Sequence, residues 1–366
     1  MAIENPRKLP AERMQPSARV VNLGGDRGEI SQSGAELIRF GKEEQDRRKD
    51  SPVYVDGADV AREHEKVEHV LMVDPRLGFN NRTHRFWINH LPPGGEEGQH
   101  WKTLGHRHTV EAVIYWISGH GYSIIDGKRY DWQAGDFVCV PLFAWHRHVN
   151  ESQERAAYAA STTGPLSMGL GQAVYEDERF PEYWVYAQQG EKALHTLIPG
   201  GAEIDSGAGG NGEPQSMAGR LYAEQVAFAF QEEDRRRQSR VLVKGSELEF
   251  EPTAMGRVAY VVDPRIGFHV KALATLVAEI PPGKHSGAHR HLYDEIDYVM
   301  AGAGHCVIDD SDYTIKKGDA LAVPMFAWHQ YFNSGDEPLR ILAHSTRPAM
   351  ENLGLVLTHQ GELADY

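Results

Sequence analysis

The feature that most constrains this chain is an internal repeat that covers most of its 366 residues. Ala35-Glu36 recurs as Ala223-Glu224, and Val73-Asp74-Pro75-Arg76 recurs as Val262-Asp263-Pro264-Arg265. The later matches, in pairs, are His106 and His289, His108 and His291, Gly119 and Gly302, Gly135-Asp136 and Gly318-Asp319, Trp145-His146 and Trp328-His329, and Asn150 and Asn333. So many matches in one register indicate a tandem duplication of a single structural module.

Each copy begins with a helical pattern and continues with short β-branched and aromatic runs separated by glycine or aspartate. We expect helices over Ala35–Arg48 and Ala223–Arg237. The expected strands include Val113–Ile117, Tyr122–Ile125 and Phe137–Val140 in the first copy, and Tyr298–Met300, His305–Ile308 and Ala320–Val323 in the second. This pattern predicts an all-β body in each copy, a small antiparallel barrel or jelly roll preceded by a helix.

The predicted domain organisation has four parts. They are an N-terminal arm at 1–34, a first module at 35–165, a connecting segment at 166–215 and a second module at 216–366. Within the connection, the glycine-rich run at 199–212 is expected to be a flexible loop. The aromatic-rich stretch at 165–198 is expected to pack on the barrels as a helical or irregular cover.

Composition limits the classes of function. A hydrophobic content of 41% with 25% charged residues is typical of a soluble globular protein. The net charge of −14 argues against a nucleic-acid partner, because a phosphate-binding surface normally carries a basic excess. Cys139 and Cys306 form no paired motif, and no run is apolar enough for a signal peptide or a membrane span. We therefore expect a cytoplasmic protein with a small-molecule partner.

Histidines at alternate positions predict a metal site in each module. His106 and His108 share one face of an extended strand, and His146 returns to them on a later strand. In the second copy Glu295 follows His291 by four residues, an even step, and so shares that face. The candidate ligands are therefore His106, His108 and His146 in the first site, and His289, His291, Glu295 and His329 in the second.

The two sites differ at one position, because Ala112 stands where the second copy has Glu295. The neighbouring acids Glu111 and Asp294 are an odd step from the histidines and should point away from the metal. The first site is then a three-His site. In six-coordinate geometry it leaves up to three open positions, enough for a bidentate substrate and one small molecule such as dioxygen.

The motifs Gly105-His106-x-His108 and Gly135-Asp136 … Pro141 … His146 resemble those of the cupin superfamily, and the second copy resembles a second cupin. The run from His106 to Ala112, with Trp145-His146-x-His148, is similar to the gentisate, salicylate and 1-hydroxy-2-naphthoate 1,2-dioxygenases. The resemblance implies two tandem cupin barrels (double-stranded β-helices, or jelly rolls). It also implies a homo-oligomeric dioxygenase of aromatic catabolism that cleaves the ring of a gentisate-, salicylate- or hydroquinone-like compound with O2.

The resemblance also implies roles for single residues. His106, His108 and His146 would hold Fe(II), while the second site would hold iron, manganese, zinc or nickel. His148 shares the face of His146 and would hydrogen-bond the substrate or a reaction intermediate, or alternatively lie at the rim of the site.

One position departs from the family pattern. Members usually carry an arginine that holds the substrate carboxylate where this chain has Ile114. Either the substrate lacks the acid group, or Arg82, Arg85 or Arg129 supplies the charge, although each of these is expected to be a solvated surface residue.

Three other classes fit parts of the pattern. An oxalate-decarboxylase-like manganese enzyme would use a three-His, one-Glu set, which only the second copy has. A three-His zinc site can activate water for hydrolysis. A non-catalytic ligand-binding cupin would have little need of two complete ligand sets.

Overall fold

The computed structural model describes residues 32–64, 67–184 and 216–365. Most of the expected N-terminal arm and all of the expected loop at 199–212 lie outside these residues. The chain divides into two compact units, residues 1–51 and residues 52–366. The described part of the first unit is helix α1 (Gln32–Asp50), which confirms the helix expected over Ala35–Arg48.

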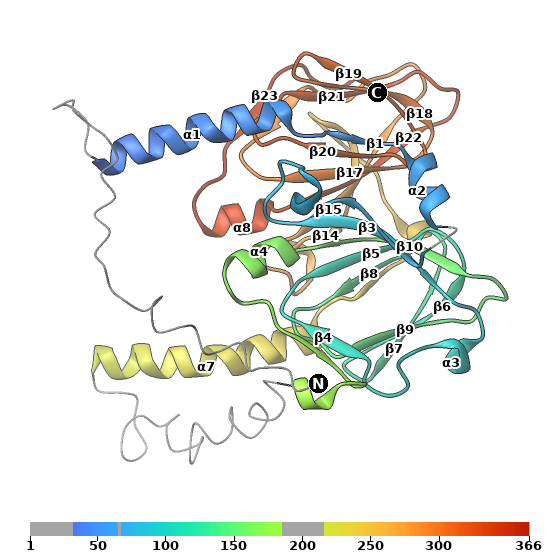
Figure 1. Ribbon diagram of the computed structural model, residues 1–366, viewed down its shortest axis with the longest axis vertical. Helices are drawn as coiled ribbons and strands as arrows, with labels where there is room; N and C mark the ends of the chain where they lie inside the picture. Colours follow the sequence, from blue (N-terminus) through green and yellow to red (C-terminus); the bar gives the residue numbers. More distant parts are fainter. Residues whose placement is uncertain (1–31, 65–66, 185–215, 366) are drawn as a thin grey trace, which may run out of the picture. The chain divides into compact units, whose positions relative to one another are not determined.

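The second unit contains two all-β barrels, as the sequence predicts (Figure 1). The larger sheet of the first barrel contains, in spatial order, β8 (Phe137–Val140), β5 (Ala112–Trp116), β10 (Ala156–Thr162), β3 (Arg85–Leu91) and β2 (His69–Val73). Its smaller sheet contains β11 (Tyr175–Asp177), β4 (His106–His108), β9 (His146–Asn150), β6 (His120–Ile125) and β7 (Lys128–Gln133). All of these neighbours are antiparallel.

The second barrel repeats this plan. Its larger sheet contains β20 (Ala320–Val323), β17 (Glu295–Ala301), β22 (Leu339–Ser345), β15 (Ala274–Ile280), β14 (Gly256–Val262) and β13 (Glu251–Thr253). Its smaller sheet contains β19 (Ser311–Lys316), β18 (Ala303–Ile308), β21 (His329–Asn333), β16 (His289–His291) and β23 (Thr358–Gln360). Each of the six expected strands corresponds to an observed strand whose ends differ by no more than about three residues.

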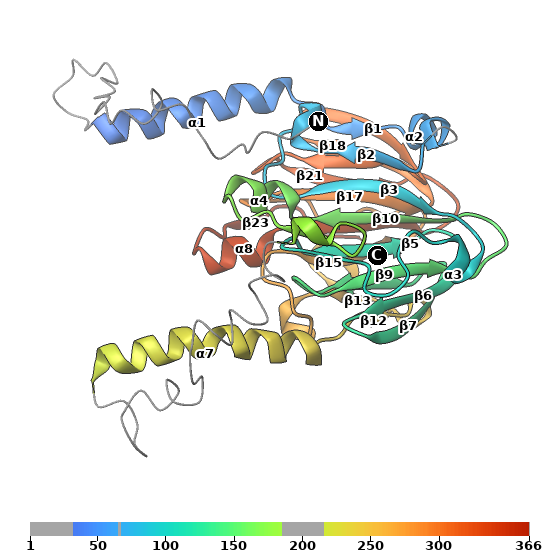
Figure 2. The same cartoon turned by 60° about the horizontal axis from the view of Figure 1, so that its bottom comes forward.

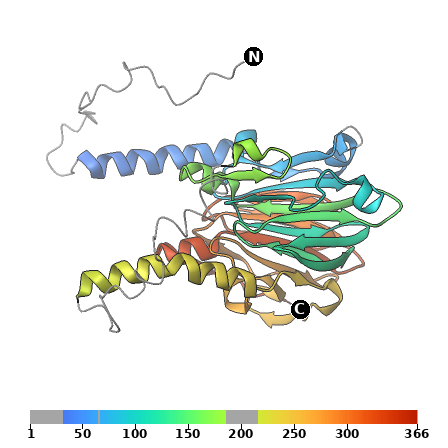
Figure 3. The ribbon, with the colours of Figure 1, turned by 90° about the horizontal axis from the view of Figure 1, so that it is seen from below.

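Helices connect the strands and cover their ends. They are α2 (Gly57–His64), α3 (Gly95–Gly98), α4 (Gly164–Gly169), α7 (Met217–Gln238) and α8 (Arg347–Asn352), with single 3-10 turns η2 (Pro75–Leu77), η3 (Pro181–Tyr183), η4 (Gly245–Glu247) and η5 (Pro264–Ile266). The helix expected over Ala223–Arg237 lies within α7, which is drawn in yellow in Figure 3. Near the end of α7, Arg236 Nε donates to Asp126 Oδ2, between β6 and β7, at 2.9 Å. Among the described residues, no helix has the length and apolar character needed to span a membrane.

The expected cover at 165–198 is partly a strand. Residues 175–177 form β11, which pairs with β4 and so extends the smaller sheet of the first barrel. The helical part of the expectation is confirmed by α4 and η3. Residues 185–198 of this stretch lie outside the described part of the chain.

The start of each repeat adds a strand to the other barrel (Figure 1). β1 (Tyr54–Val55) pairs with β20 of the second barrel. Its counterpart β12 (Leu242–Val243) pairs with β8 of the first. A glycine follows each exchanged strand at a close approach of two backbones. A Cβ atom on Gly57 would lie 2.4 Å from the carbonyl of Gly318, and one on Gly245 would lie 2.1 Å from that of Gly135. The module boundaries at 35–165 and 216–366 stay a prediction.

Buried carboxylates hold the exchanged segments in place. Asp319 accepts a hydrogen bond of 2.8 Å from the backbone N–H of Gly57, and Asp136 accepts one of 3.0 Å from Gly245. Lys244 adds an ion pair to Asp136 at 2.8 Å. Because each bond joins one repeat to the other, the exchange is anchored symmetrically at both ends.

Glu111 and Asp294 point away from the candidate metal sites, as their odd spacing predicts, and each reaches into the opposite repeat. Glu111 Oε2 accepts hydrogen bonds from the backbone N–H groups of Ala272 and Leu273 at 3.0 and 2.8 Å. Asp294 Oδ2 accepts from the N–H and the hydroxyl of Thr83 at 2.8 and 2.7 Å. These two acids therefore fix the strands that follow, β15 and β3, which form walls of the barrels.

The largest apolar cluster lies between the two barrels, where their larger sheets meet (Figure 2). It combines Phe86, Val113 and Phe137 of the first barrel with Leu273, Ile296 and Leu342 of the second. Separate clusters fill the interior of each barrel. Since apolar burial is the main driving force of folding, the shared cluster makes the two barrels depend on one another.

We predict that Glu111→Gln lowers the free energy of unfolding by about 2 kcal/mol, because the amide cannot accept all the buried N–H groups that the carboxylate does. The midpoint of urea denaturation measures this change. Glu97→Gln, at an exposed position of α3, is the control and should change stability by less than about 0.5 kcal/mol. Equal stability of the two variants would contradict the role of Glu111.

Candidate metal sites

The first candidate site lies inside the first barrel, on its smaller sheet. His106 and His108 share one face of β4, and His146 lies opposite His106 on the neighbouring strand β9. One ligand atom from each residue can be chosen so that all lie within 4.8 Å of one another. The structure thus brings together the three histidines that the sequence pattern selects.

Backbone carbonyls fix the orientation of two of these rings. His108 Nδ1 lies 2.8 Å from the carbonyl oxygen of Val110, and His146 Nδ1 lies 2.9 Å from that of Ala144. A carbonyl only accepts, so Nδ1 carries the proton in both rings and Nε2 keeps its lone pair free. This is the tautomer that a metal-binding histidine needs.

Burial keeps the histidines of the first site neutral. It lowers the pKa of His108 to about 4, and it lowers the pKa of His106 and His146 well below the ordinary value of 6.5. Repulsion among the neighbouring rings lowers the last two further. Neutral imidazoles are metal ligands, whereas protonated ones are not.

The second candidate site repeats the arrangement with one acidic residue added. His289 and His329 lie opposite one another on β16 and β21, and Glu295 faces them from β17. The ligand atoms of His289, His291, Glu295 and His329 lie within 4.8 Å of one another. Burial opposes ionisation of Glu295, but His291 and His329 still hold its pKa well below its usual value. In the first barrel the same place holds Ala112, which is buried.

Both sites fit a divalent metal. The Nε2 atoms of His291 and His329 lie 3.4 and 3.5 Å from the Glu295 carboxylate, yet neither makes a hydrogen bond to any described residue. Buried polar atoms are normally hydrogen-bonded, so two converging lone pairs without a donor fit the coordination of a cation. Three imidazole nitrogens, as in the first site, suit iron, manganese, nickel or zinc, and so do three imidazole nitrogens with one carboxylate oxygen, as in the second.

A cavity of about 290 Å³ lies against the first site. Its lining includes the three histidines, the apolar side chains of Ala112, Ile114 and Val140, and the rings of Trp101, Tyr158 and Tyr175. Its volume is close to the lower end of small-molecule sites, which is about 300 Å³. The first site is therefore open to a ligand of about one aromatic ring with small substituents.

Arg85 also lines this cavity, in contrast to the solvated position expected for it. Its Nε donates to Thr162 Oγ1 at 3.3 Å, and a Cβ atom on Gly164 would lie 3.1 Å from the guanidinium. Nη1 is 3.9 Å from Asp74, but both oxygens of that carboxylate accept from Arg76 at 2.8 Å. Much of the Arg85 charge is thus available to the cavity.

The other two candidate arginines lie elsewhere. Arg129 pairs with Asp131 and Glu151 on the surface hairpin, and Arg82 is exposed. Neither lines the cavity beside the first site. Of the three arginines named from the sequence, Arg85 alone lines the cavity beside the first site.

His148 is buried and lines the cavity two residues beyond His146. Its Nδ1 lies 2.7 Å from Ser123 Oγ, which holds the ring in place. Burial, followed by the nearby His108, lowers the pKa of His148 to about 4, so the ring is neutral near pH 7. A neutral imidazole can both accept and donate a proton.

Trp101 and Tyr175 were not selected as site residues from the sequence. Both rings lie against His106, with centroids 4.5 and 5.3 Å away, and both side chains donate a hydrogen bond of 3.1 Å to Asp177. Tyr175 belongs to the aromatic-rich stretch after the first module, which was a usable signal. Trp101 lies in residues 96–104, where the first copy of the repeat is longer than the second, so the repeat gives it no counterpart.

Comparison with known proteins supports the resemblance to the cupin superfamily. A cupin domain model matches residues 87–162 and 276–345. A 1-hydroxy-2-naphthoate 1,2-dioxygenase from Nocardioides sp. (strain KP7) is 24% identical over 258 residues, which are 69% of this chain and 61% of that protein. A gentisate 1,2-dioxygenase from Aquipseudomonas alcaligenes is 24% identical over 251 residues, which are 68% of this chain and 67% of that protein.

Among solved structures, a salicylate 1,2-dioxygenase from Pseudaminobacter salicylatoxidans superposes with a TM-score of 0.58 at 16% identity. The match covers 85% of this chain and 88% of that chain. This likeness supports two tandem cupin barrels. In sequence, the chain spans about three fifths of the length of the naphthoate dioxygenase.

We predict two equivalents of divalent metal per chain in the wild-type protein. His108→Ala and His291→Ala should each remove one equivalent, because each deletes a donor from a different site. Elemental analysis of protein purified without oxygen measures this. His120→Ala, an exposed histidine on β6 outside both groups, should keep both equivalents. Loss of both metals from either ligand variant would argue against independent sites.

Proposed function

Because this chain belongs to the cupin superfamily and carries two cupin barrels in tandem, we propose that it is a non-haem Fe(II) ring-cleaving dioxygenase. Its substrate would be a hydroxylated aromatic compound, and both atoms of O2 would enter the product. The naphthoate and gentisate dioxygenases among its relatives support this reaction class.

The observation that carries the proposal is the first site, where Ala112 replaces the acidic ligand of the second site beneath a ring-sized cavity. Three neutral ligands leave the charge of a dication uncompensated and up to three positions open. His106, His108 and His146 would hold the dication, and an anionic hydroxylated aromatic compound in the cavity would balance its charge. The second site, with four protein ligands, would hold iron, manganese, zinc or nickel with less room for two reactants.

A bound ferrous ion would supply the redox chemistry, because it can pass electrons to dioxygen beside a chelated aromatic ring. The chain supplies position and exclusion of water. His106, His108 and His146 present their lone pairs to one point, and Ile114, Val140 and neighbouring apolar side chains line the rest of the cavity. Because the site holds both reactants together and excludes water, a step that is bimolecular in solution becomes effectively unimolecular.

Arg85 is the proposed anchor for a substrate carboxylate. It reaches the cavity from β3 and compensates for Ile114, which stands where the relatives' pattern has an arginine. A guanidinium binds a carboxylate through two parallel N–H donors. We therefore infer a hydroxylated aromatic acid, rather than a neutral hydroquinone, as the preferred substrate.

His148 is the proposed proton-handling residue. Its ring borders the cavity, and Ser123 holds its Nδ1, so Nε2 is the nitrogen left to meet the substrate. At neutral pH it could accept a proton from a phenolic hydroxyl as the substrate binds.

The proposal also includes a cytoplasmic homo-oligomer without a nucleic-acid partner. The net charge of −14 supports the last point. Light scattering of the purified protein would measure the assembly state. A monomer at micromolar concentration would contradict the proposed homo-oligomer.

We predict oxygen uptake with gentisate or salicylate by the iron-loaded protein. His108→Ala should abolish the uptake, because it disrupts the three-His site, and His291→Ala should retain it. An oxygen electrode and the absorbance change of the opened ring provide two readouts. Zinc in place of iron, with no oxygen consumption, would instead favour a hydrolase.

In the same assay His148→Phe should keep the metal of the first site and lower kcat roughly 100-fold, the usual contribution of a proton-transfer group. Unchanged kcat in this variant would show that His148 packs against its neighbours and takes no part in proton transfer.

We predict that Arg85→Ala lowers kcat/KM for a carboxylated substrate by about 10- to 100-fold, because a charge-assisted hydrogen bond is lost. Activity toward hydroquinone, which has no carboxylate, should change little. Arg129→Ala, which removes a surface ion-pair residue, is the matched control. A similar loss with both substrates would show that Arg85 acts through packing rather than through recognition.

A further inference from the structure

We propose that the second barrel binds a small α-hydroxy acid, of about the size of lactate, at its own metal site. This ligand site is distinct from the aromatic site of the first barrel. The inference rests on the second metal of the proposed function, but it does not depend on ring cleavage.

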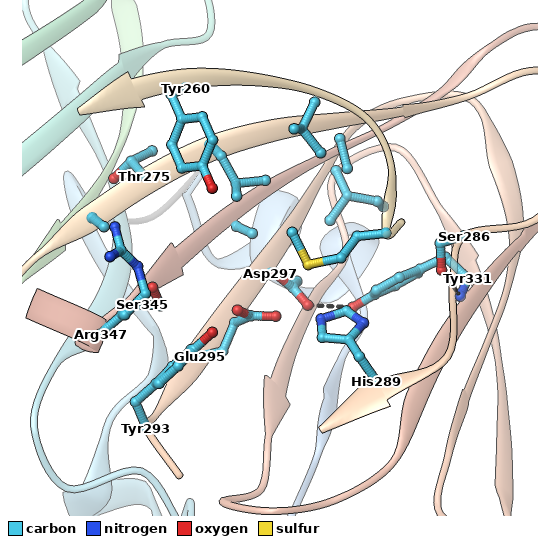
Figure 4. A pocket seen from close by; sticks show the side chains of 17 residues that line it. Tyr260, Thr275, Ser286, His289, Tyr293, Glu295, Asp297, Tyr331, Ser345 and Arg347 are labelled. Carbon is cyan, nitrogen blue, oxygen red and sulfur yellow. Dashed lines mark hydrogen bonds between the residues drawn. The ribbon is translucent and has the colours of Figure 1, made fainter. Parts of the chain in front are cut away.

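The second barrel has its own cavity beside His289 and Glu295, and it is smaller than the first (Figure 4). Its volume is about 90 Å³, against about 290 Å³ beside the first site. A cavity of this size exceeds the space that a single water needs, about 15 Å³. It therefore admits a ligand of a few heavy atoms and excludes a substituted aromatic ring.

The small volume follows from changes at matched positions of the repeat. Tyr293 stands where the first barrel has Val110, and its ring stacks on His291 with centroids 3.8 Å apart. Arg347 stands where the first barrel has Gly164 and is held by Asp263 and Glu351. These side chains occupy space that is open in the first barrel, so the second site has different ligand requirements.

Asp297 supplies the feature that points to a ligand. It is fully buried, and one oxygen accepts a hydrogen bond from the Tyr331 hydroxyl, as the dashed line in Figure 4 shows. The other oxygen, Oδ1, is buried and has no hydrogen-bond partner among the described residues. Asp297 lines the cavity together with Glu295, two residues before it on the same face of β17. A buried acceptor without a donor, facing a cavity, indicates a donor group on a bound molecule.

The metal set narrows the ligand class. A divalent ion held by three histidines and Glu295 would keep, in six-coordinate geometry, two open positions. The charge of Arg347 is already taken up by Asp263 and Glu351. A ligand with two oxygen donors, one of them a carboxylate, would fill the open positions and would be favoured over a neutral ligand by the charge of the dication.

An α-hydroxy acid meets all of these requirements. Its carboxylate and its hydroxyl oxygen form a five-membered chelate with a metal, and its hydroxyl hydrogen can be donated to Asp297 Oδ1. A neutral diol lacks the negative charge. A small dicarboxylate carries a second charge and has no hydrogen for Asp297.

The test uses the His108→Ala protein loaded with Co(II), so that the second site alone holds metal. L-lactate should change the visible Co(II) spectrum and bind about tenfold more tightly than propionate, which has the same three-carbon skeleton but no hydroxyl. Asp297→Ala in the same background should remove this preference. Asp310→Ala, the same substitution at an exposed position between β18 and β19, should leave it unchanged.

Equal binding of lactate and propionate, or no spectral change with lactate, would overturn the proposal. Because this comparison uses the unaltered Asp297, it decides even if Asp297→Ala fails to fold. Absence of Co(II) from the His108→Ala protein would overturn it by removing the second metal. Oxygen uptake by the wild-type enzyme is a separate measurement, so failure of ring cleavage would leave the lactate result standing.

Discussion

The structure depends on hydrogen bonds that buried carboxylates of one repeat make to backbone N–H groups of the other. Glu111 holds the segment that leads into β15, and Asp294 holds the segment that leads into β3. Each acid directly precedes the wall position that is Ala112 in one barrel and Glu295 in the other. The same short segment therefore joins the barrels on one face and shapes a candidate metal site on the opposite face. This alternation along a single strand is why the sites lie at equivalent places in the two barrels.

The two barrels show how one scaffold yields two kinds of site by exchanges at few positions. The matched pairs are Ala112 and Glu295, Ile114 and Asp297, His148 and Tyr331, Val110 and Tyr293, Arg85 and Ala274, and Gly164 and Arg347. In the first barrel the exchanges leave neutral ligands, an open cavity and a cationic wall. In the second they give an acidic candidate ligand, a smaller cavity and a buried acceptor. The histidine triad itself is common to both barrels, so the differences in chemistry come from the walls.

Much of the fold and of the candidate sites could be predicted from the sequence, because it contains an internal repeat and because side chains alternate along a strand. The repeat identified the two modules, and the two-residue period of a strand placed Glu295 inside its barrel and Glu111 outside. Arg85 was harder to predict, because its position depends on the pairing of β3 with β10 and on the space left by Gly164, both of which are non-local. The exchange of β1 and β12 was also hidden, since strands of two residues carry no periodic signal.

The exchange of β1 and β12 has a consequence for the origin of the chain. Each terminal strand completes the sheet of the other repeat, which is the arrangement of two identical subunits that swap their N-terminal arms around a two-fold axis. Duplication of one gene and fusion of the two copies would produce such a polypeptide from a swapped dimer. In a homodimer both sites are the same, because one gene encodes both subunits. In a fused chain the two halves can differ, so one site can lack an acidic ligand that the other has.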